Sequence, residues 1–299
     1  MKRYGDRTLT LAVLALSVTN GIDAMGASSA TPLPSPSASV AAAAAVPAAA
    51  EKSSTSTTTA PSPSPTILSS ASTPAFAEID ELFKKRIEEA SARKALLLSR
   101  EMLLKTPSGG AAWRTAMGCY VVGFKFTQGD SKQDAREALY EEGIKAAKKG
   151  VEVDPNCGPC HFWIGVNTAL LGESVGPFKM LGSLAEIRTH AEKAIALEPA
   201  YAAGGAYRLL GQLEQALPGI LGGSDRRAQE YFEKAVAVSA GDPMNYVYLI
   251  KILEKRDRSE EALALAKKAA ELPPPPADQY ESISSAVEIR EYLKSKTVK

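Results

Sequence analysis

The residues of this chain best suited to chemistry lie in one short run, Cys157-Gly158-Pro159-Cys160-His161. Two cysteines separated by two residues and followed by a histidine form the attachment signature of a c-type haem, with two thioether links and His161 as an axial ligand. A sixth ligand would have to come from His190 or from a methionine such as Met180, and the sequence selects neither. Haem attachment is therefore one interpretation of the run.

The same five residues have three other interpretations. Cys-Gly-Pro-Cys is the active-site sequence of thiol–disulfide oxidoreductases, but that chemistry follows a strand in a βαβ unit, which this sequence does not predict. Zinc takes about four ligands, and Cys157, Cys160 and His161 leave one missing. In an oxidising compartment the two cysteines instead close a small local disulfide that fixes the start of a helix, and we favour this interpretation.

No other set of side chains has the spacing of a nucleophile, a base and an acid. The acidic pairs Glu141-Glu142 and Glu260-Glu261 are typical of solvated helix faces. The chain has 35 basic and 34 acidic residues, so its net charge gives no argument for nucleic acid or an anionic membrane as a partner. We therefore predict a protein that is not an enzyme and holds no metal.

The first 30 residues have the pattern of a secretory signal peptide. Lys2, Arg3 and Arg7 form a basic region, and the apolar run Leu9 to Val18 is too short to span a bilayer as a helix. Ser28-Ser29-Ala30 is a suitable cleavage site. We expect a periplasmic or secreted protein, without lipid attachment because no cysteine precedes Cys119.

Residues 31–74 are almost entirely Ala, Pro, Ser and Thr. Such a segment cannot bury enough apolar surface to offset the entropy of ordering, so we predict a disordered linker. Residues 75–299 have helical periodicity in almost every segment and no alternating strand pattern of useful length. We expect them to form one helical domain.

Four segments of this domain end alike, with a lysine, a small residue and then apolar residues. The small residue lets two helices approach closely, the apolar residues face the core, and a following proline stops the helix. The segments are 149–155, 193–199, 234–238 and 268–273.

The spacing of these segments indicates an internal repeat. Gly150 and Ala194 are 44 residues apart, Ala194 and Ala235 are 41 apart, and Ala235 and Ala269 are 34 apart. A tetratricopeptide (TPR) repeat, which is a pair of helices, has a period of about 34 residues. We therefore predict an all-α, TPR-like α-solenoid of about five helix pairs, closed by a capping helix from Ala277 to about Lys294.

Two connections within the predicted pairs are apolar. They are Glu173 to Met180, which contains Gly176-Pro177-Phe178, and Leu217 to Gly223. Because solvent-facing loops are usually polar, we expect both to be buried, by packing on the concave face of the solenoid or over the helix ends, by lining a ligand cavity or by forming a subunit contact.

Four runs together suggest a family: Cys160 to Trp163, His190 to Pro199, Leu217 to Gly223, and Tyr231 to Ala235. They resemble the TPR family that includes the periplasmic T component of TRAP transporters. They are also similar to the eukaryotic regulators of microtubule dynamics, which share a Cys-His-x-Trp start before a similar long helix pair.

The resemblance implies an exported helical protein, often trimeric, that docks a periplasmic substrate-binding protein and shields an apolar ligand. The relatives of the T component are typically lipoproteins, and this chain lacks the cysteine that lipid attachment needs. Relatives keep the histidine and tryptophan without the cysteine pair, which implies that His161 serves the helix.

A TPR solenoid binds its partners on the face formed by the first helix of each pair. Four of the eight residues that we place on this face are basic and two are apolar, which favours a protein partner or ligand with a carboxylate and an apolar body. The eight are Arg114, Phe162, Val166, Arg208, Gln212, Gln215, Lys251 and Lys255.

Overall fold

The computed structural model describes residues 74–297. The predicted signal peptide (1–30) and all but the last residue of the predicted linker (31–74) lie outside the described residues.

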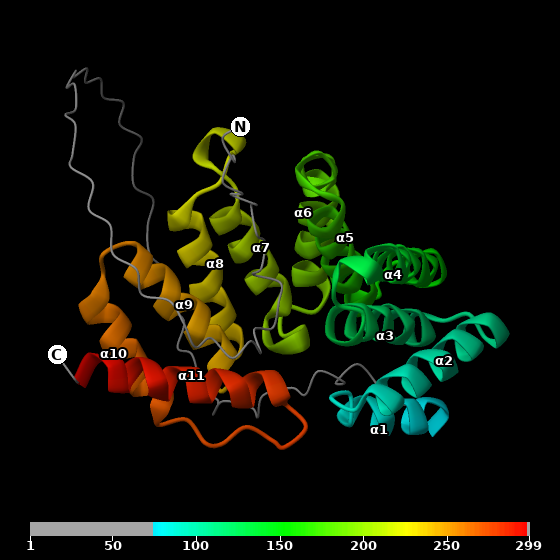
Figure 1. Cartoon of the computed structure of the whole chain (residues 1–299), viewed down its shortest axis with the longest axis horizontal. Coiled ribbons are helices and arrows are strands. Elements are labelled where there is room, and N and C mark those ends of the chain that lie inside the picture. Colours follow the sequence, from blue (N-terminus) through cyan, green and yellow to red (C-terminus); the bar gives the residue numbers. More distant parts are fainter. Residues whose placement is uncertain (1–73, 298–299) are drawn as a thin grey trace, which may run out of the picture. The chain divides into compact units, whose positions relative to one another are not determined.

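Eleven α-helices account for most of the described part of the chain, and no strand occurs in that part (Figure 1). The prediction of an all-α fold is confirmed. The helices are α1 (Ala77–Lys84), α2 (Glu89–Lys105), α3 (Gly109–Phe126), α4 (Gln133–Val153), α5 (Gly158–Val175), α6 (Pro177–Leu197), α7 (Gly205–Ala216), α8 (Asp225–Val238), α9 (Pro243–Lys255), α10 (Ser259–Ala270) and α11 (Tyr280–Thr297).

Consecutive helices pack in pairs: α1 on α2, α3 on α4, α5 on α6, α7 on α8, and α9 on α10. Each pair also contacts the next, and α11 packs on α9 and α10 at the end of the series. These five pairs and one terminal helix are the TPR-like arrangement that the repeated segments predict.

The repeated segments explain why the pairs pack closely. Gly150 lies against the side chains of Ala112 and Cys160, and Ala194, Ala235 and Ala269 are all buried. Side chains at the helix starts supply the first hydrogen bonds. The oxygens of Ser108, Ser224 and Asp242 accept from backbone N–H groups two or three residues further on.

Helix α5 is the most deeply enclosed element, because every residue from Gly158 to Gly172 is buried. A helix that is apolar on all sides belongs inside a protein rather than at its surface. The buried apolar residues form two clusters, one from Ile79 to Leu217 around α5, and one from Ala228 to Ile289 around α9. Within residues 74–297, no helix has both the length and the apolar content to cross a bilayer.

The two apolar connections are not buried as a whole, which contradicts the prediction. Met180 and Leu217 are buried, but Phe178 is 91% exposed and Ile220 is 94% exposed. Pro177 starts α6 earlier than expected, so Phe178 lies on the first turn of a helix and points away from its neighbours. In the second connection, the turn Gly219–Leu221 leaves Ile220 in solvent.

Candidate functional site

A cavity of about 100 Å³ lies among the first helices of the pairs and the start of α11. Its apolar lining comes mainly from α3, α5, α7 and α9, and includes Met117, Val121, Phe162, Val166, Leu209 and Met244. Its polar lining consists of Arg86, Tyr120, Arg208, Gln212, Tyr248 and Glu281. The cavity thus has apolar walls with a few polar groups, as small-molecule sites do.

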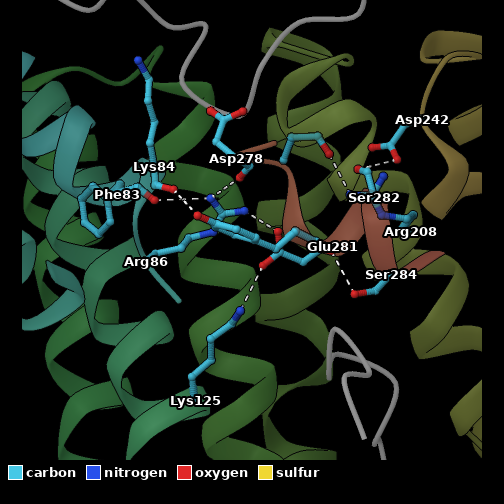
Figure 2. Close-up of polar contacts among 12 residues, drawn as sticks. Phe83, Lys84, Arg86, Lys125, Arg208, Asp242, Asp278, Glu281, Ser282 and Ser284 are labelled. Atoms are coloured by element: carbon cyan, nitrogen blue, oxygen red, sulfur yellow. Dashed lines mark hydrogen bonds and ion pairs between the residues drawn. The ribbon is translucent and has the colours of Figure 1, made fainter. Parts of the chain in front are cut away.

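Glu281, on the first turn of α11, forms ion pairs with Arg86, in the turn between α1 and α2, and with Lys125 of α3 (Figure 2). Arg86 bonds to one carboxylate oxygen, and Lys125 Nζ lies 3.4 Å from the other. Burial alone would raise the pKa of Glu281, but the two positive charges outweigh it and hold the pKa below its ordinary value. The carboxylate therefore stays charged inside the protein.

Further bonds fix the start of α11. Arg86 also donates to the carbonyl oxygens of Asp278 and Phe83, at 2.9 and 3.3 Å. The Tyr280 hydroxyl donates to the carbonyl oxygen of Lys84, and Ser282 donates to Asp242 Oδ1 at 2.8 Å (Figure 2). The segment that leads into α11 is thereby attached both to the first pair of helices and to the start of α9.

Arg208, on α7, is 9% exposed and is held by neutral acceptors. Its Nη1 donates to Ala203 O and Asn245 Oδ1, and its Nη2 donates to Ala202 O. Both alanines have positive φ angles, 50° and 54°, which L residues rarely adopt. The guanidinium therefore holds a strained segment at the cavity wall, and strain of this kind often occurs at binding sites.

The hydroxyl of Tyr120, on α3, is buried and has no hydrogen-bond partner in the described part of the chain. Burial raises the pKa of this phenol well above its ordinary value, so the group is a neutral donor at neutral pH. Gln212, which also lines the cavity, is hydrogen-bonded to Tyr248.

The structure brings together four of the eight residues that the sequence placed on the binding face. Phe162, Val166, Arg208 and Gln212 all line the cavity. Arg114 does not, contrary to the prediction, because its side chain is completely buried and bonded to Asp80 by two hydrogen bonds of 2.6 and 2.8 Å.

The other three residues lie outside the cavity lining. Gln215 is half-buried near the end of α7. Lys251 pairs with Glu288 and Lys255 pairs with Asp225, each at 2.7 Å and with partly exposed side chains. Both lysines therefore already have an intramolecular partner.

Cys157 and Cys160 are joined in a disulfide at the start of α5. A Cβ added at Gly150 would lie 2.6 Å from Cys160 Sγ, and one at Gly109 would lie 3.2 Å from Cys157 Sγ. Both sulfurs therefore pack directly on the backbones of α4 and α3, without the free face that a bulky macrocycle needs. The arrangement does not fit a c-type haem. Within residues 74–297, no group of three or more His, Cys, Asp or Glu side chains is placed to hold a metal ion.

His161 faces His190 of α6, with their Nδ1 atoms 2.8 Å apart. One imidazole must donate and the other accept, so the contact requires at least one neutral ring. Burial is the main cause that lowers the pKa of both rings; nearby Lys193 adds to this for His161, and the charge of His161 adds to it for His190. The pair is therefore neutral at neutral pH.

Acidification should weaken the fold through this histidine pair. Because both pKa values are lower in the folded state than the ordinary 6.5, the unfolded chain binds more protons below pH 6.5, and stability falls as the pH drops below that value. Replacing both histidines, His161→Gln with His190→Gln, should remove this component. Urea unfolding at pH 7.5 and 5.5 measures it.

Buried carboxyls act in the opposite direction, because burial raises the pKa of Glu173 to about 7. Wild type and the double variant contain the same buried carboxyls. The difference in the pH dependence of their stability therefore reports on the histidines alone. The chain has only two histidines, which makes the comparison complete. Equal pH dependence in both proteins would contradict the assignment.

Among the polar residues that line the cavity, sequence reasoning missed four: Arg86, Tyr120, Tyr248 and Glu281. Tyr120 was visible as an aromatic seven residues after Trp113, a spacing that indicates only a packed helix face. Arg86 and Glu281 are 195 positions apart, and no local pattern links them.

Residues 75–214 match the family model described as regulator of microtubule dynamics protein 1-3. Two solved structures are similar. A thermophilic TPR protein of Thermus thermophilus, TTC0263, has 17% identity and a TM-score of 0.46 over 70% of this chain and 99% of its own. MamA has 18% identity and a TM-score of 0.41 over 71% of this chain and 95% of its own. No curated protein matches the sequence.

Proposed function

We propose that this protein is a non-catalytic helical scaffold that binds a protein partner. The observation that carries the proposal is the exposure of Phe178, on the first turn of α6, and of Ile220, in the turn Gly219–Leu221; each is more than nine-tenths accessible. TPR-like arrays act through binding rather than through chemistry, and their helix pairs present loops and faces to other chains.

Neither side chain contributes to the core in this position. Leaving a bulky apolar side chain in water forgoes about 1.5–3 kcal/mol relative to burying it. Val175, Leu181 and Leu221 are also exposed beside them, so the two turns carry several apolar residues rather than single ones. Several exposed apolar side chains at one turn favour a surface that another chain covers.

Replacing both residues, Phe178→Ser with Ile220→Ser, should reduce partner capture at least tenfold. The tagged protein is purified from extracts of the organism that produces it, and co-purifying proteins are quantified against the variant. Because both side chains are exposed, the melting temperature should stay within a few degrees of wild type.

The matched control is Leu104→Ser, since Leu104 of α2 is 79% exposed but lies outside both turns. It should leave capture unchanged. Equal capture by all three proteins would overturn the proposal. If the partner is a second copy of this chain, sedimentation velocity should show a smaller species for the double variant but not for wild type or Leu104→Ser.

The finer assignments rest on the sequence. Resemblance to the T component of TRAP transporters supports an exported accessory protein whose partner is a substrate-binding protein, and this remains a proposal. A location in the periplasm or outside the cell depends on the predicted signal peptide at residues 1–30, which lies outside the described residues. Sequencing the N-terminus of the mature protein tests that location.

A further inference from the structure

The cavity beside α11 has the size of a small organic molecule. Its volume is about 100 Å³, and a dry apolar cavity of roughly 150 Å³ accommodates a benzene ring. Met117, Val121, Val166 and Leu209 are among the residues of its apolar wall. An apolar group of only a few heavy atoms fits this volume.

Arg208 offers this cavity unused hydrogen-bond donors. A guanidinium carries five N–H groups. Three of those of Arg208 are used, two on Nη1 and one on Nη2. The Nε–H and one Nη2–H remain, and this combination of donors suits a carboxylate bound by two parallel hydrogen bonds.

The charge of Arg208 is also uncompensated. Its hydrogen bonds within the range 74–297 all go to neutral oxygens, although its side chain is nine-tenths buried. Arg86, by contrast, has its charge balanced by Glu281. The polar lining of the cavity thus carries two arginines and one carboxylate, which leaves one positive charge without a partner.

Tyr120 provides the independent second observation. It is 5% exposed, it lines the cavity, and its hydroxyl makes no hydrogen bond within the described residues. An unsatisfied buried hydroxyl costs about 1–3 kcal/mol, so a native protein keeps one where a ligand or water completes it.

From these observations we infer that the cavity binds a small apolar carboxylate, with Arg208 and the Tyr120 hydroxyl as the donors to its carboxylate. The ligand class is a short aliphatic carboxylate of about the size of isovalerate. The two turns that carry Phe178 and Ile220 do not line this cavity. Ligand binding and the proposed partner binding can therefore be tested independently.

The test is a titration of the purified full chain with isovalerate and with isovaleramide, followed by NMR. The amide has the same shape but no charge, so isovalerate should bind at least tenfold more tightly. Tyr120→Phe should weaken isovalerate binding about tenfold, the effect expected for one hydrogen bond to a charged group. This variant should fold normally, because the hydroxyl that it removes has no protein partner in the structure.

Three controls make the result decisive. Tyr140→Phe alters another buried tyrosine, one outside the cavity lining, and should leave the affinity unchanged. Arg208→Lys keeps the charge but removes the two-pronged donor, and should weaken binding if thermal melts show that it folds. The variant with Phe178→Ser and Ile220→Ser should bind isovalerate like wild type. Failure of isovalerate to bind, equal binding of acid and amide, or an unchanged affinity in Tyr120→Phe would each overturn the inference.

Discussion

Replacing Gly150 with alanine should lower the free energy of unfolding by about 3 kcal/mol, the upper range for forcing one methyl group into a packed core. The added Cβ would lie 2.5 Å from the Cβ of Ala112 and 2.6 Å from Cys160 Sγ. Both neighbours belong to helices that α4 packs against, so relief requires whole helices to separate. Urea unfolding measures the loss.

The same substitution at Gly182 is the matched control. Gly182 lies inside α6, and a Cβ added there would meet nothing within 4 Å. Alanine is the better helix former by about 1 kcal/mol, so Gly182→Ala should raise stability by up to that amount. If Gly150 is a close contact between helices, glycine-to-alanine substitution should lower stability at Gly150 and raise it at Gly182. A change of the same sign at both positions would falsify that role.

Glu281→Gln should cost about 3 kcal/mol, because removing one partner of a buried ion pair leaves the others uncompensated. Arg86 and Lys125 would then face a neutral amide beside the cavity. The control is Glu288→Gln on the same helix, where the partly exposed pair with Lys251 should contribute at most about 1 kcal/mol.

The pH dependence of this cluster has a definite sign. The pKa of Glu281 is lower in the folded state than its ordinary value of 4.5, so its stabilising contribution is complete above pH 4.5. It is lost as the pH falls through the folded-state pKa. Wild type should therefore lose more stability than Glu281→Gln between pH 5 and pH 3, and parallel curves would contradict the assignment.

The sequence predicted the fold well because its evidence was local and repeated. The small residues Gly150, Ala194, Ala235 and Ala269 each report a close helix contact, and all four behave as predicted. Their spacing alone indicates stacked pairs.

The same approach was less successful for side chains. Arg114 was placed on a surface by its position in the repeat, but its partner Asp80 lies 34 residues away in another helix. Phe178 and Ile220 were expected to be buried because they are apolar, but both are exposed. Whether an apolar side chain is buried depends on which surfaces the other helices cover. The pairing of Arg86 with Glu281 depends on the position of the last helix, which no local pattern encodes.

The pairing of Arg86 with Glu281 should make the two ends of the helical array unfold together. In most repeat proteins each unit contacts only its neighbours, so the ends fray first and the middle survives. Here the link between Arg86 and Glu281 joins residues 195 positions apart. The last helix is then held by the first pair as well as by its own neighbours, so neither terminus can peel away alone. Hydrogen exchange should show α1 and α11 opening together, in one cooperative event with the helices between them.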